Sequence, residues 1–298
     1  MKTLREYIKE ASDNGIAIGH FNISNLEMLH GIYNAVLKLS EEIGHKIPVI
    51  VGVSEGEEEF IGKDEVVALV KNIREKDIYP LFLNADHHYS FESVKSIIDL
   101  GYDSFVIDGA KLPIEENITL TKKCVDYARE LGRREEKYII TESELGFIGQ
   151  SSKLLEEIPD GVSEKTMTNP RDAKLFVEET GIDLLAPSVG NIHGMVKGGN
   201  PKLDIGRIKQ IKETCGIPLV LHGGSGISDE DFVSAIKAGI SIIHISTELR
   251  VAYRQALEKE LKDNPKEVAP YKYLSPAVKA VEDVVYKKLK LFNLIFKG

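Results

Sequence analysis

The sequence predicts a single (β/α)8 barrel, or TIM barrel, in which eight parallel strands alternate with helices and close into a cylinder. Short apolar runs recur along the 298 residues, with helical patterns between them. No G-x-G-x-x-G motif follows the first run, so a dinucleotide-binding fold receives little support. No linker or change in composition marks a domain boundary. A doubly wound open sheet is the main alternative, although it seldom needs eight evenly spaced units.

The predicted elements follow in order. The eight strand candidates are residues 16–21, 48–53, 80–88, 105–107, 138–141, 184–187, 218–221 and 242–245. The helix candidates are residues 25–39, 64–76, 91–100, 114–131, 203–213 and 229–238, with one more that enters through Thr168-Asn169-Pro170. Asp64 suits the N-cap of the second helix, and Pro170 suits a first helical turn. We expect residues 1–298 to form one barrel domain with a C-terminal helical extension from about residue 248, whose apolar end docks on the body or on a second subunit.

The composition indicates which kinds of partner and which cellular compartment to expect. A net charge of −9, without any block of Lys and Arg, argues against a nucleic-acid surface. No apolar stretch approaches the ~20 residues that a membrane span needs, and residues 1–6 lack the apolar centre of a signal peptide. Cys124 and Cys215 lie in amphipathic segments and resemble reduced cysteines of helices. A cytoplasmic protein without nucleic-acid or membrane partners is expected.

Histidines cluster where a barrel places its chemistry. Six of the eight lie at or just after predicted strand ends, namely His20, His87, His88, His193, His222 and His244. A packed core histidine explains any one of them, but it explains the joint distribution poorly. Neutral imidazole is the commonest ligand of zinc, and three protein ligands are typical of a catalytic zinc site. The third, sixth and seventh strands each offer a histidine for such a site.

Two further patterns lie at strand ends. Glu142 and Glu144 are two residues apart, so they share one face of the fifth strand, where they can bind a cation, orient a ligand or be solvated. The seventh strand is followed by Gly223-Gly224-Ser225-Gly226, whose backbone can approach an anion closely. Barrels often bind phosphate in the loops after strands seven and eight, and Ser246-Thr247 adds two hydroxyls there.

These residues together resemble a known family over essentially the whole chain. The matching stretches are His20-Phe21-Asn22, Val53-Ser54-Glu55-Gly56, Ala85-Asp86-His87, Glu142-Ser143-Glu144-Leu145-Gly146, Val189-Gly190-Asn191-Ile192-His193-Gly194, His222-Gly223-Gly224-Ser225-Gly226 and Ser246-Thr247-Glu248-Leu249. They are similar to the class II, metal-dependent ketose-bisphosphate aldolases, which cleave fructose or tagatose bisphosphate into two triose phosphates.

The resemblance implies a role for each matching residue. His87, His193 and His222 would bind zinc or a similar divalent ion, Glu144 would lie near a secondary metal position, and Asp86 would be the acid/base. Gly194, Gly223, Ser225 and Thr247 would hold a phosphate, with Ser246 and His244 beside them, and the loop backbone would complete a monovalent-cation site for Na⁺ or K⁺. Asn22 and Ser54 would contact the substrate, and Lys197 lies in a loop that the family uses near the ligand.

The sequence also departs from the family pattern. The family usually has His at Asn84, a small residue at His88, Asn at His244 and often a small residue at His20. A carboxylate implicated in proton transfer at the enolate carbon is expected near Ser151-Ser152, where this chain has acids only at Glu156 and Glu157. The role of His20, His88 and His244 stays open at this point.

The expected function is a zinc-dependent aldolase that reversibly cleaves a ketose bisphosphate, with fructose 1,6-bisphosphate first among the candidates, to dihydroxyacetone phosphate and an aldehyde phosphate. Tagatose bisphosphate or another ketose phosphate is the alternative within this class. A Schiff-base aldolase would need an inward lysine, and Lys197 lies only in a loop. A catalytically silent sugar-phosphate binder is the third alternative. The apolar C-terminal segment favours a homodimer or homotetramer.

Overall fold

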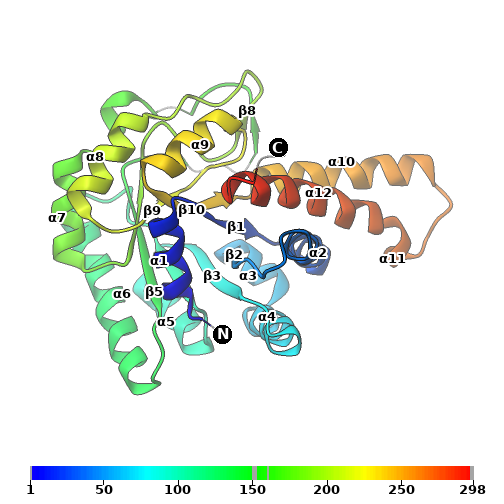
Figure 1. The fold of residues 1–298 in the computed structure, drawn as a ribbon, viewed down its shortest axis with the longest axis horizontal. Coiled ribbons are helices and arrows are strands. Elements are labelled where there is room, and N and C mark those ends of the chain that lie inside the picture. The colour runs from blue at the N-terminus through cyan, green and yellow to red at the C-terminus, as the bar shows by residue number, and fades with distance from the viewer. Residues whose placement is uncertain (1, 150–152, 160, 296–298) are drawn as a thin grey trace.

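The computed structural model describes residues 2–149, 153–159 and 161–295, and these form the predicted closed barrel (Figure 1). Around the barrel the strands follow one another as β1-β10-β9-β7-β5-β4-β3-β2, and all the pairs are parallel. The strands are β1 (Ile18–Asn22), β2 (Val49–Ser54), β3 (Leu81–His88), β4 (Ser104–Ile107), β5 (Ile140–Leu145), β7 (Leu184–Pro187), β9 (Leu219–Leu221) and β10 (Ile240–Ile245). Each of the eight predicted runs is a barrel strand, so the fold prediction is confirmed.

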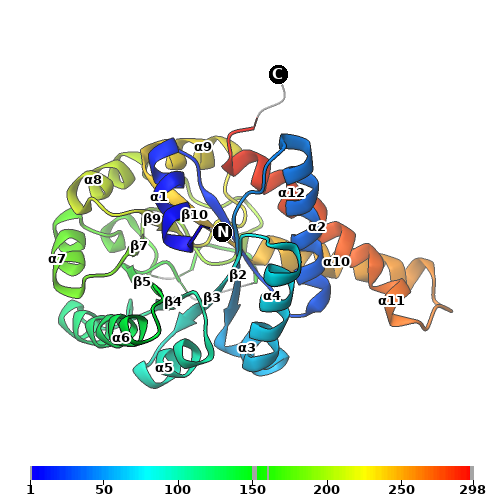
Figure 2. The same ribbon diagram turned by 60° about the horizontal axis from the view of Figure 1, so that its bottom comes forward.

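Helices surround the barrel strands (Figure 2). They are α1 (Leu4–Asn14), α2 (Leu26–Ile43), α3 (Glu55–Ile61), α4 (Lys63–Asp77), α5 (Phe91–Leu100), α6 (Ile114–Arg134), α7 (Pro170–Thr180), α8 (Ile205–Cys215), α9 (Asp229–Ala238), α10 (Thr247–Asp263), α11 (Pro270–Tyr273) and α12 (Ser275–Phe292), with a 3-10 turn at Glu164–Thr166. The predicted N-cap at Asp64 is wrong. Gly62 is the N-cap of α4, because α3 ends there and the chain turns at a φ of 98°, which favours glycine.

Inward-facing residues change from apolar to polar along the strands. Near the start of the strands, Ile18, Ile50, Phe82, Ile140, Leu184, Val220 and Ile242 form a core that Leu4, Ile8 and Ala11 of α1 help to complete. Two residues further along, the inward positions of β1, β3, β5 and β10 carry His20, Asn84, Glu142 and His244, all buried. Because every second residue of a strand points inward, the barrel interior consists of an apolar layer at its base and a buried polar layer above it, beneath the mouth.

One glycine makes room for this polar layer. A Cβ atom on Gly52 of β2 would lie 2.1 Å from the His20 ring, and two residues further along the same strand Ser54 reaches the mouth. Glycine at position 52 therefore leaves the space that the imidazole of His20 occupies inside the barrel.

The C-terminal helices form an arm beside the barrel. In Figure 1, α10 runs away from the barrel, α11 lies at the far end of the arm and α12 returns along it. The end of α12 is attached to the body, because Leu289 and Phe292 are fully buried and Ala17 donates a backbone hydrogen bond of 3.0 Å to Phe292. The described part of the apolar C-terminal segment thus docks on its own chain. No described helix is both long enough and apolar enough to cross a membrane.

Candidate active site at the carboxyl ends of the strands

A cavity of about 240 Å³ opens at the carboxyl ends of the strands. Its lining residues lie at the ends of seven barrel strands or in the segments that follow them, and they are Asn22, Ser54, Asp86, His87, Tyr89, Asp108, His193, Gly194, Gly223, Ser225, His244, Ser246, Thr247 and Arg250. Most of the residues predicted for the site therefore lie on one surface. Their roles remain predictions, because the structure gives their positions and not their chemistry.

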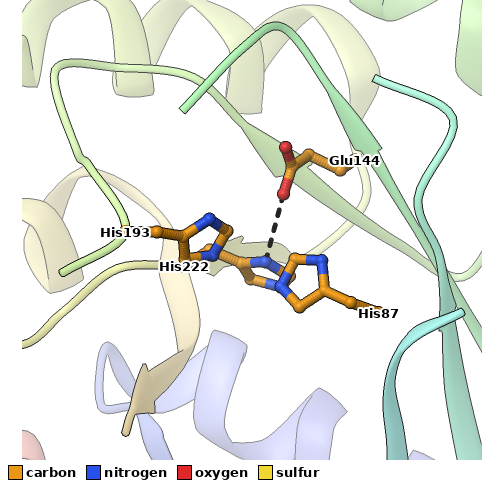
Figure 3. Close-up of side chains that lie close together, drawn as sticks. All are labelled: His87, Glu144, His193 and His222. Carbon is orange, nitrogen blue, oxygen red and sulfur yellow. Dashed lines mark ion pairs between the residues drawn. The ribbon is translucent and has the colours of Figure 1, made fainter. Parts of the chain in front are cut away.

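The four residues proposed to lie at the metal converge from different elements. His87 lies on β3, Glu144 on β5, His193 in the loop after β7 and His222 directly after β9. Each offers one ligand atom, and these atoms lie within 4.8 Å of one another. Figure 3 shows the three imidazole rings facing a common centre, with the Glu144 carboxylate above His222. His87 adopts a positive φ of 54°, an uncommon conformation for a residue with a side chain.

A second set of groups orients each imidazole. His87 Nδ1 lies 3.1 Å from Asp108 Oδ2, His193 Nδ1 lies 2.8 Å from the Gly149 carbonyl, and His222 Nε2 lies 2.6 Å from Glu142 Oε1. Metal-binding histidines usually donate their second ring N–H to such an oxygen, which fixes the ring and the tautomer. The remaining nitrogens, Nε2 of His87 and His193 and Nδ1 of His222, are then free to bind an ion.

Two atoms at this centre lack the partners that buried polar atoms normally have. His222 Nδ1 and Glu144 Oε2 are buried and make no hydrogen bond, although they lie 3.3 Å apart. An uncompensated buried polar atom is costly. Neutral imidazole nitrogens with one carboxylate oxygen are a donor set that zinc accepts. The residues present therefore fit a divalent ion.

The three histidines differ in their affinity for protons. Burial opposes the charge of His87, but Asp86 and the hydrogen bond with Asp108 raise its pKa to about 9. Burial and the neighbouring His87 and His222 lower the pKa of His193 to about 3. The pKa of His222 is raised well above its ordinary value despite burial, because it lies between Glu142 and Glu144. Without an ion, His193 is neutral and the other two hold protons.

Asp86 lies at the cavity wall beside the proposed metal ligands. Its Oδ2 accepts a hydrogen bond of 2.9 Å from Asn22 Nδ2, and its Oδ1 lies 3.3 Å from His244 Nδ1. Burial opposes ionisation, but His87 and His244 lower the pKa of Asp86 well below its usual range. Asp86 is therefore a carboxylate that can accept a proton from a hydroxyl group in the cavity.

His20 and His244 extend the imidazole cluster toward the barrel base. The rings of His20 and His244 stack 3.5 Å apart, and the ring of His244 lies 4.1 Å from that of His222. His20 Nε2 lies 3.0 Å from Asn84 Nδ2, which places Asn84 beneath the site rather than in it. Burial lowers the pKa of His20 to about 4 and that of His244 well below its ordinary value. Both rings are therefore neutral, and His244 alone of the two lines the cavity.

His88 lies outside the site. Alternation from the inward Phe82 and Asn84 would point His88 into the barrel, but the register of β3 against β4 shifts between Ala85 and His88, and His87 has a positive φ. His87 therefore lines the cavity, whereas His88 contacts the surrounding helices. His88 Nδ1 lies 2.5 Å from Ser93 Oγ, and its Nε2 lies 3.2 Å from Glu58 Oε1. It joins β3 to α3 and α5, so it does not build a second metal site with the inward histidines.

Two glycines shape the proposed phosphate end of the cavity. Gly223 has a φ of 61°, and a Cβ there would lie 2.1 Å from the Ile192 carbonyl oxygen. Gly194 has a φ of 94°, and a Cβ would meet the Lys153 carbonyl oxygen at 2.8 Å. Only glycine fits at these two positions, and the exposed backbone of both lines the cavity. Ser225 Oγ, which also lines it, accepts a hydrogen bond of 3.0 Å from the Glu248 N–H.

The structure does not bring Lys197 to the cavity. Its ammonium group lies 2.5 Å from Glu156 Oε1, and 63% of its side chain is exposed. Each residue of this pair directly follows one strand of a two-stranded sheet, in which β6 (Leu154–Leu155) pairs with β8 (Met195–Val196). Ser151-Ser152, where the family carboxylate was expected, lies outside the described residues.

Sequence reasoning missed three residues that line the cavity, namely Tyr89, Asp108 and Arg250. Asp108 and Tyr89 each come directly after a strand, so the rule that found the histidines could have found both. Arg250 lies in the first turn of α10, one turn beyond the Ser246-Thr247 pair, and the helical period places it on the same side of the cavity. A positively charged side chain in this position is suited to an anionic ligand.

Comparisons with known proteins agree with this architecture. The family model described as "Fructose-bisphosphate aldolase class-II" matches residues 2–295. A "Fructose-bisphosphate aldolase" of Staphylococcus aureus (strain Mu50) is 37% identical over 294 residues, which cover 98% of this chain and 96% of that protein. A "Probable fructose-bisphosphate aldolase" of Bacillus subtilis (strain 168) is also 37% identical over 294 residues, covering 98% of this chain and 97% of that protein.

A solved structure shows the same fold. The crystal structure of the YdjI aldolase from Escherichia coli K12 superposes with a TM-score of 0.79 at 32% identity, covering 97% of this chain and 96% of that one. The chain belongs to the class II fructose-bisphosphate aldolase family. It is a class II aldolase, a carbon–carbon lyase, as the resemblance implied.

Proposed function

We propose that this aldolase uses zinc or a similar divalent ion to cleave fructose 1,6-bisphosphate reversibly into dihydroxyacetone phosphate and an aldehyde phosphate. The observation that carries the proposal is the convergence of His87, His193 and the fully buried His222 at the wall of the cavity that Asp86 also lines. The names of the Staphylococcus and Bacillus relatives support this choice of substrate. A place in glycolysis would follow from it.

Each group has a task that its position supports. A divalent ion held by His87, His193 and His222, with Glu144 beside it, would stabilise the negative charge of the enolate that forms when the carbon–carbon bond breaks. Asp86 takes the proton of the C4 hydroxyl as that bond breaks and returns it in the reverse reaction. Asp108, Glu142 and the Gly149 carbonyl keep the three imidazoles in orientation.

The two ends of the substrate need separate binding groups. The backbone of Gly194 and Gly223, with the hydroxyls of Ser225, Ser246 and Thr247, surrounds one phosphate, and Na⁺ or K⁺ bound by the loop backbone would complete this end. Arg250 is the one Lys or Arg among the described residues that line the cavity, so it is suited to the other phosphate. Asn22 and Ser54 lie beside it and contact the hydroxylated chain.

The alternatives make different predictions. Tagatose bisphosphate differs from the fructose compound at one hydroxyl, so it remains the alternative substrate. A Schiff-base mechanism receives no support, because none of the described lining residues is a lysine and Lys197 is paired with Glu156 on the outside. A silent sugar-phosphate binder would keep the phosphate loop but show no turnover.

The test is a coupled assay that detects triose phosphate, run with fructose and tagatose bisphosphates before and after chelation. We expect turnover of the fructose compound, its loss on chelation and its recovery with zinc. Turnover that survives removal of all metal would contradict the metal proposal. Faster turnover of the tagatose compound would change the substrate but not the mechanism, and binding without turnover would support the silent binder.

We further propose a cytoplasmic homodimer or homotetramer that works on free phosphorylated sugars. Both cysteines, Cys124 and Cys215, are free thiols, which is typical of a reducing compartment. The net charge of −9 disfavours nucleic-acid partners. Light scattering coupled to gel filtration measures the oligomeric state directly.

A further inference from the structure

One buried carboxylate on α3 joins three segments that are far apart in the chain. The Glu57 side chain is 6% exposed. Its Oε2 accepts hydrogen bonds from the Ser54 N–H at 2.9 Å, the Ser54 hydroxyl at 3.0 Å and Asn22 Nδ2 at 3.1 Å. Its Oε1 accepts from the Ser24 hydroxyl at 2.9 Å and from Arg250 at 2.5 Å. The carboxylate thus ties the end of β1, the end of β2 and the start of α10 together.

The residues that Glu57 holds form one sector of the cavity. Asn22, Ser54 and Arg250 all line it. They follow or end β1, β2 and β10, which are neighbours in the barrel, whereas the proposed metal ligands come from β3, β5 and the segments after β7 and β9. We name Asn22, Ser54 and Arg250 the distal wall, because they lie outside the metal-binding cluster.

The amide of Asn22 has only one orientation in this network. Its nitrogen donates to Glu57 Oε2 at 3.1 Å and to Asp86 Oδ2 at 2.9 Å. Both partners are carboxylates, which accept and do not donate, so a flipped amide would lose both bonds. Asn22 Oδ1 is buried and has no partner in the protein. Because Asn22 lines the cavity, a water molecule or a ligand hydroxyl that enters there can donate to this oxygen.

We propose that Glu57 is a positioning residue that sets the distal wall to receive the part of the substrate beyond the bond that breaks. The proposal rests on the proposed function of the same cavity. Glu57 fixes the Asn22 carbonyl as a hydroxyl acceptor, holds Ser54 at the strand end and keeps Arg250 extended along the wall. Binding of the aldehyde half then requires no rearrangement of these groups.

The two halves of the reaction separate this role from a structural one. Exchange of the C–H proton of dihydroxyacetone phosphate with deuterated water needs the metal ligands and the phosphate loop but not the distal wall. Cleavage of a ketose bisphosphate needs both. A loss of general stability would affect exchange and cleavage alike, whereas a misplaced distal wall affects cleavage alone.

The test is Glu57→Gln, which keeps the shape but replaces one acceptor oxygen by a donor that faces Ser54 N–H or Arg250. We expect kcat/KM for fructose 1,6-bisphosphate to fall by about 10- to 100-fold, mainly through KM, while proton exchange stays within about twofold of wild type. Glu59→Gln is the matched control, because Glu59 is an exposed glutamate of the same helix. It should leave both activities and the thermal midpoint unchanged.

Arg250→Gln provides an independent arm if Glu57→Gln does not fold. It should reproduce the selective loss of cleavage, and adding Glu57→Gln to it should cost less than Glu57→Gln costs in the wild-type protein. Equal losses of exchange and cleavage, or wild-type KM in both variants, would overturn the role of Glu57. Absence of exchange and of cleavage in the wild-type protein would overturn the proposed function itself, so the two failures are distinguishable.

Discussion

The two sides of the cavity satisfy their buried polar atoms in different ways. On the distal wall, both oxygens of Glu57 accept hydrogen bonds from the protein. At the imidazole cluster, His222 Nδ1 and Glu144 Oε2 have none, and His87 holds an uncommon backbone conformation. On the distal wall the protein satisfies the whole Glu57 carboxylate and leaves only Asn22 Oδ1 without a partner, whereas the unpartnered atoms of the cluster are a donor set that fits an ion. Removal of the ion should therefore affect the imidazole cluster, whereas substitutions in the hydrogen-bond network of Glu57 should affect the distal wall.

The largest effect is expected from a ligand of the cluster. His193→Ala should abolish metal retention and cleavage, because it removes one of the three imidazoles and leaves an open position that the remaining His87, His222 and Glu144 do not fill. Elemental analysis and the coupled assay measure the two losses. His30→Ala, which removes an exposed histidine of α2, is the control and should change neither. Full activity of His193→Ala without bound metal would contradict the assignment.

Asp86 lies between the two sides and should affect chemistry rather than binding. Asp86→Asn should lower turnover by about 10²- to 10⁴-fold, the usual range for a general acid/base. Metal content and the affinity for phosphate should stay near wild type. The control is Asp126→Asn at an exposed position of α6. If KM rises and turnover persists, Asp86 is a binding contact and not the proton carrier.

Asp108 contacts the ring of His87 on the side away from the proposed metal position. Asp108→Asn keeps an acceptor for His87 Nδ1 but removes the charge that helps to raise the pKa of His87. Loss of such an outer partner typically costs about 10- to 100-fold in metal affinity. Competition with a chromophoric chelator measures this affinity, with Asp126→Asn again as control. Unchanged affinity would show that the imidazole is oriented by packing alone.

The pH dependence of metal binding follows from the same charges. His87 has a pKa of about 9 in the absence of an ion, so at pH 7 it holds a proton that an ion must displace. His222, whose pKa is also raised, holds a second proton that the ion must displace, so affinity should increase by more than tenfold per unit as the pH rises toward 9. Calorimetry at pH 7 in buffers of different ionisation enthalpy should detect release of at least one proton. Binding without proton release would mean that both His87 and His222 are already neutral.

The sequence predicted the parts of this cavity that depend on local pattern. The eight barrel strands are short apolar runs buried by helices on one side and by the barrel interior on the other, so they were recognisable without tertiary information. The clustering of histidines at strand ends followed from the same pattern. The outward direction of His88 does not follow from strand alternation, because Phe82 and Asn84 point inward and the register irregularity between Ala85 and His88 reverses the pattern.

The distal wall depends on contacts that no local pattern reports. Glu57 and Arg250 are 193 residues apart, and their ion pair arises only when the barrel closes. The helix α3 that carries Glu57 has seven residues, and its first five are all Glu or Gly, so no apolar stripe marks it. The two-residue strands β6 and β8 are too short to show any period. Ion pairs between residues far apart in the sequence and strands of two residues are therefore the features that a local sequence pattern cannot predict.

The smallest effect is expected outside both sides of the cavity, at the loop acids Glu156 and Glu157. Glu156 and Glu157 are the two acids of the loop that could replace the family carboxylate near Ser151-Ser152, and the alternative is that both are solvated and that Asp86 or a metal-bound water serves both proton steps. Both are exposed, neither lines the cavity, and Glu156 is already paired with Lys197 at 2.5 Å. An exposed pair of this kind contributes about 0–1 kcal/mol, so its loss should not disturb the fold.

We therefore expect Glu156→Gln, Glu157→Gln and the double variant to exchange the C–H proton of dihydroxyacetone phosphate with deuterated water within about twofold of the wild-type rate. NMR follows the exchange, and Asp86→Asn in the same assay shows what loss of the buried carboxylate does. If Asp86 serves both proton steps, exchange falls with Asp86→Asn and not with the loop variants. A tenfold loss in either loop variant would instead mean that the acid moves into the cavity when substrate binds, and that the proton carrier of this enzyme is supplied by the loop rather than by the strand ends.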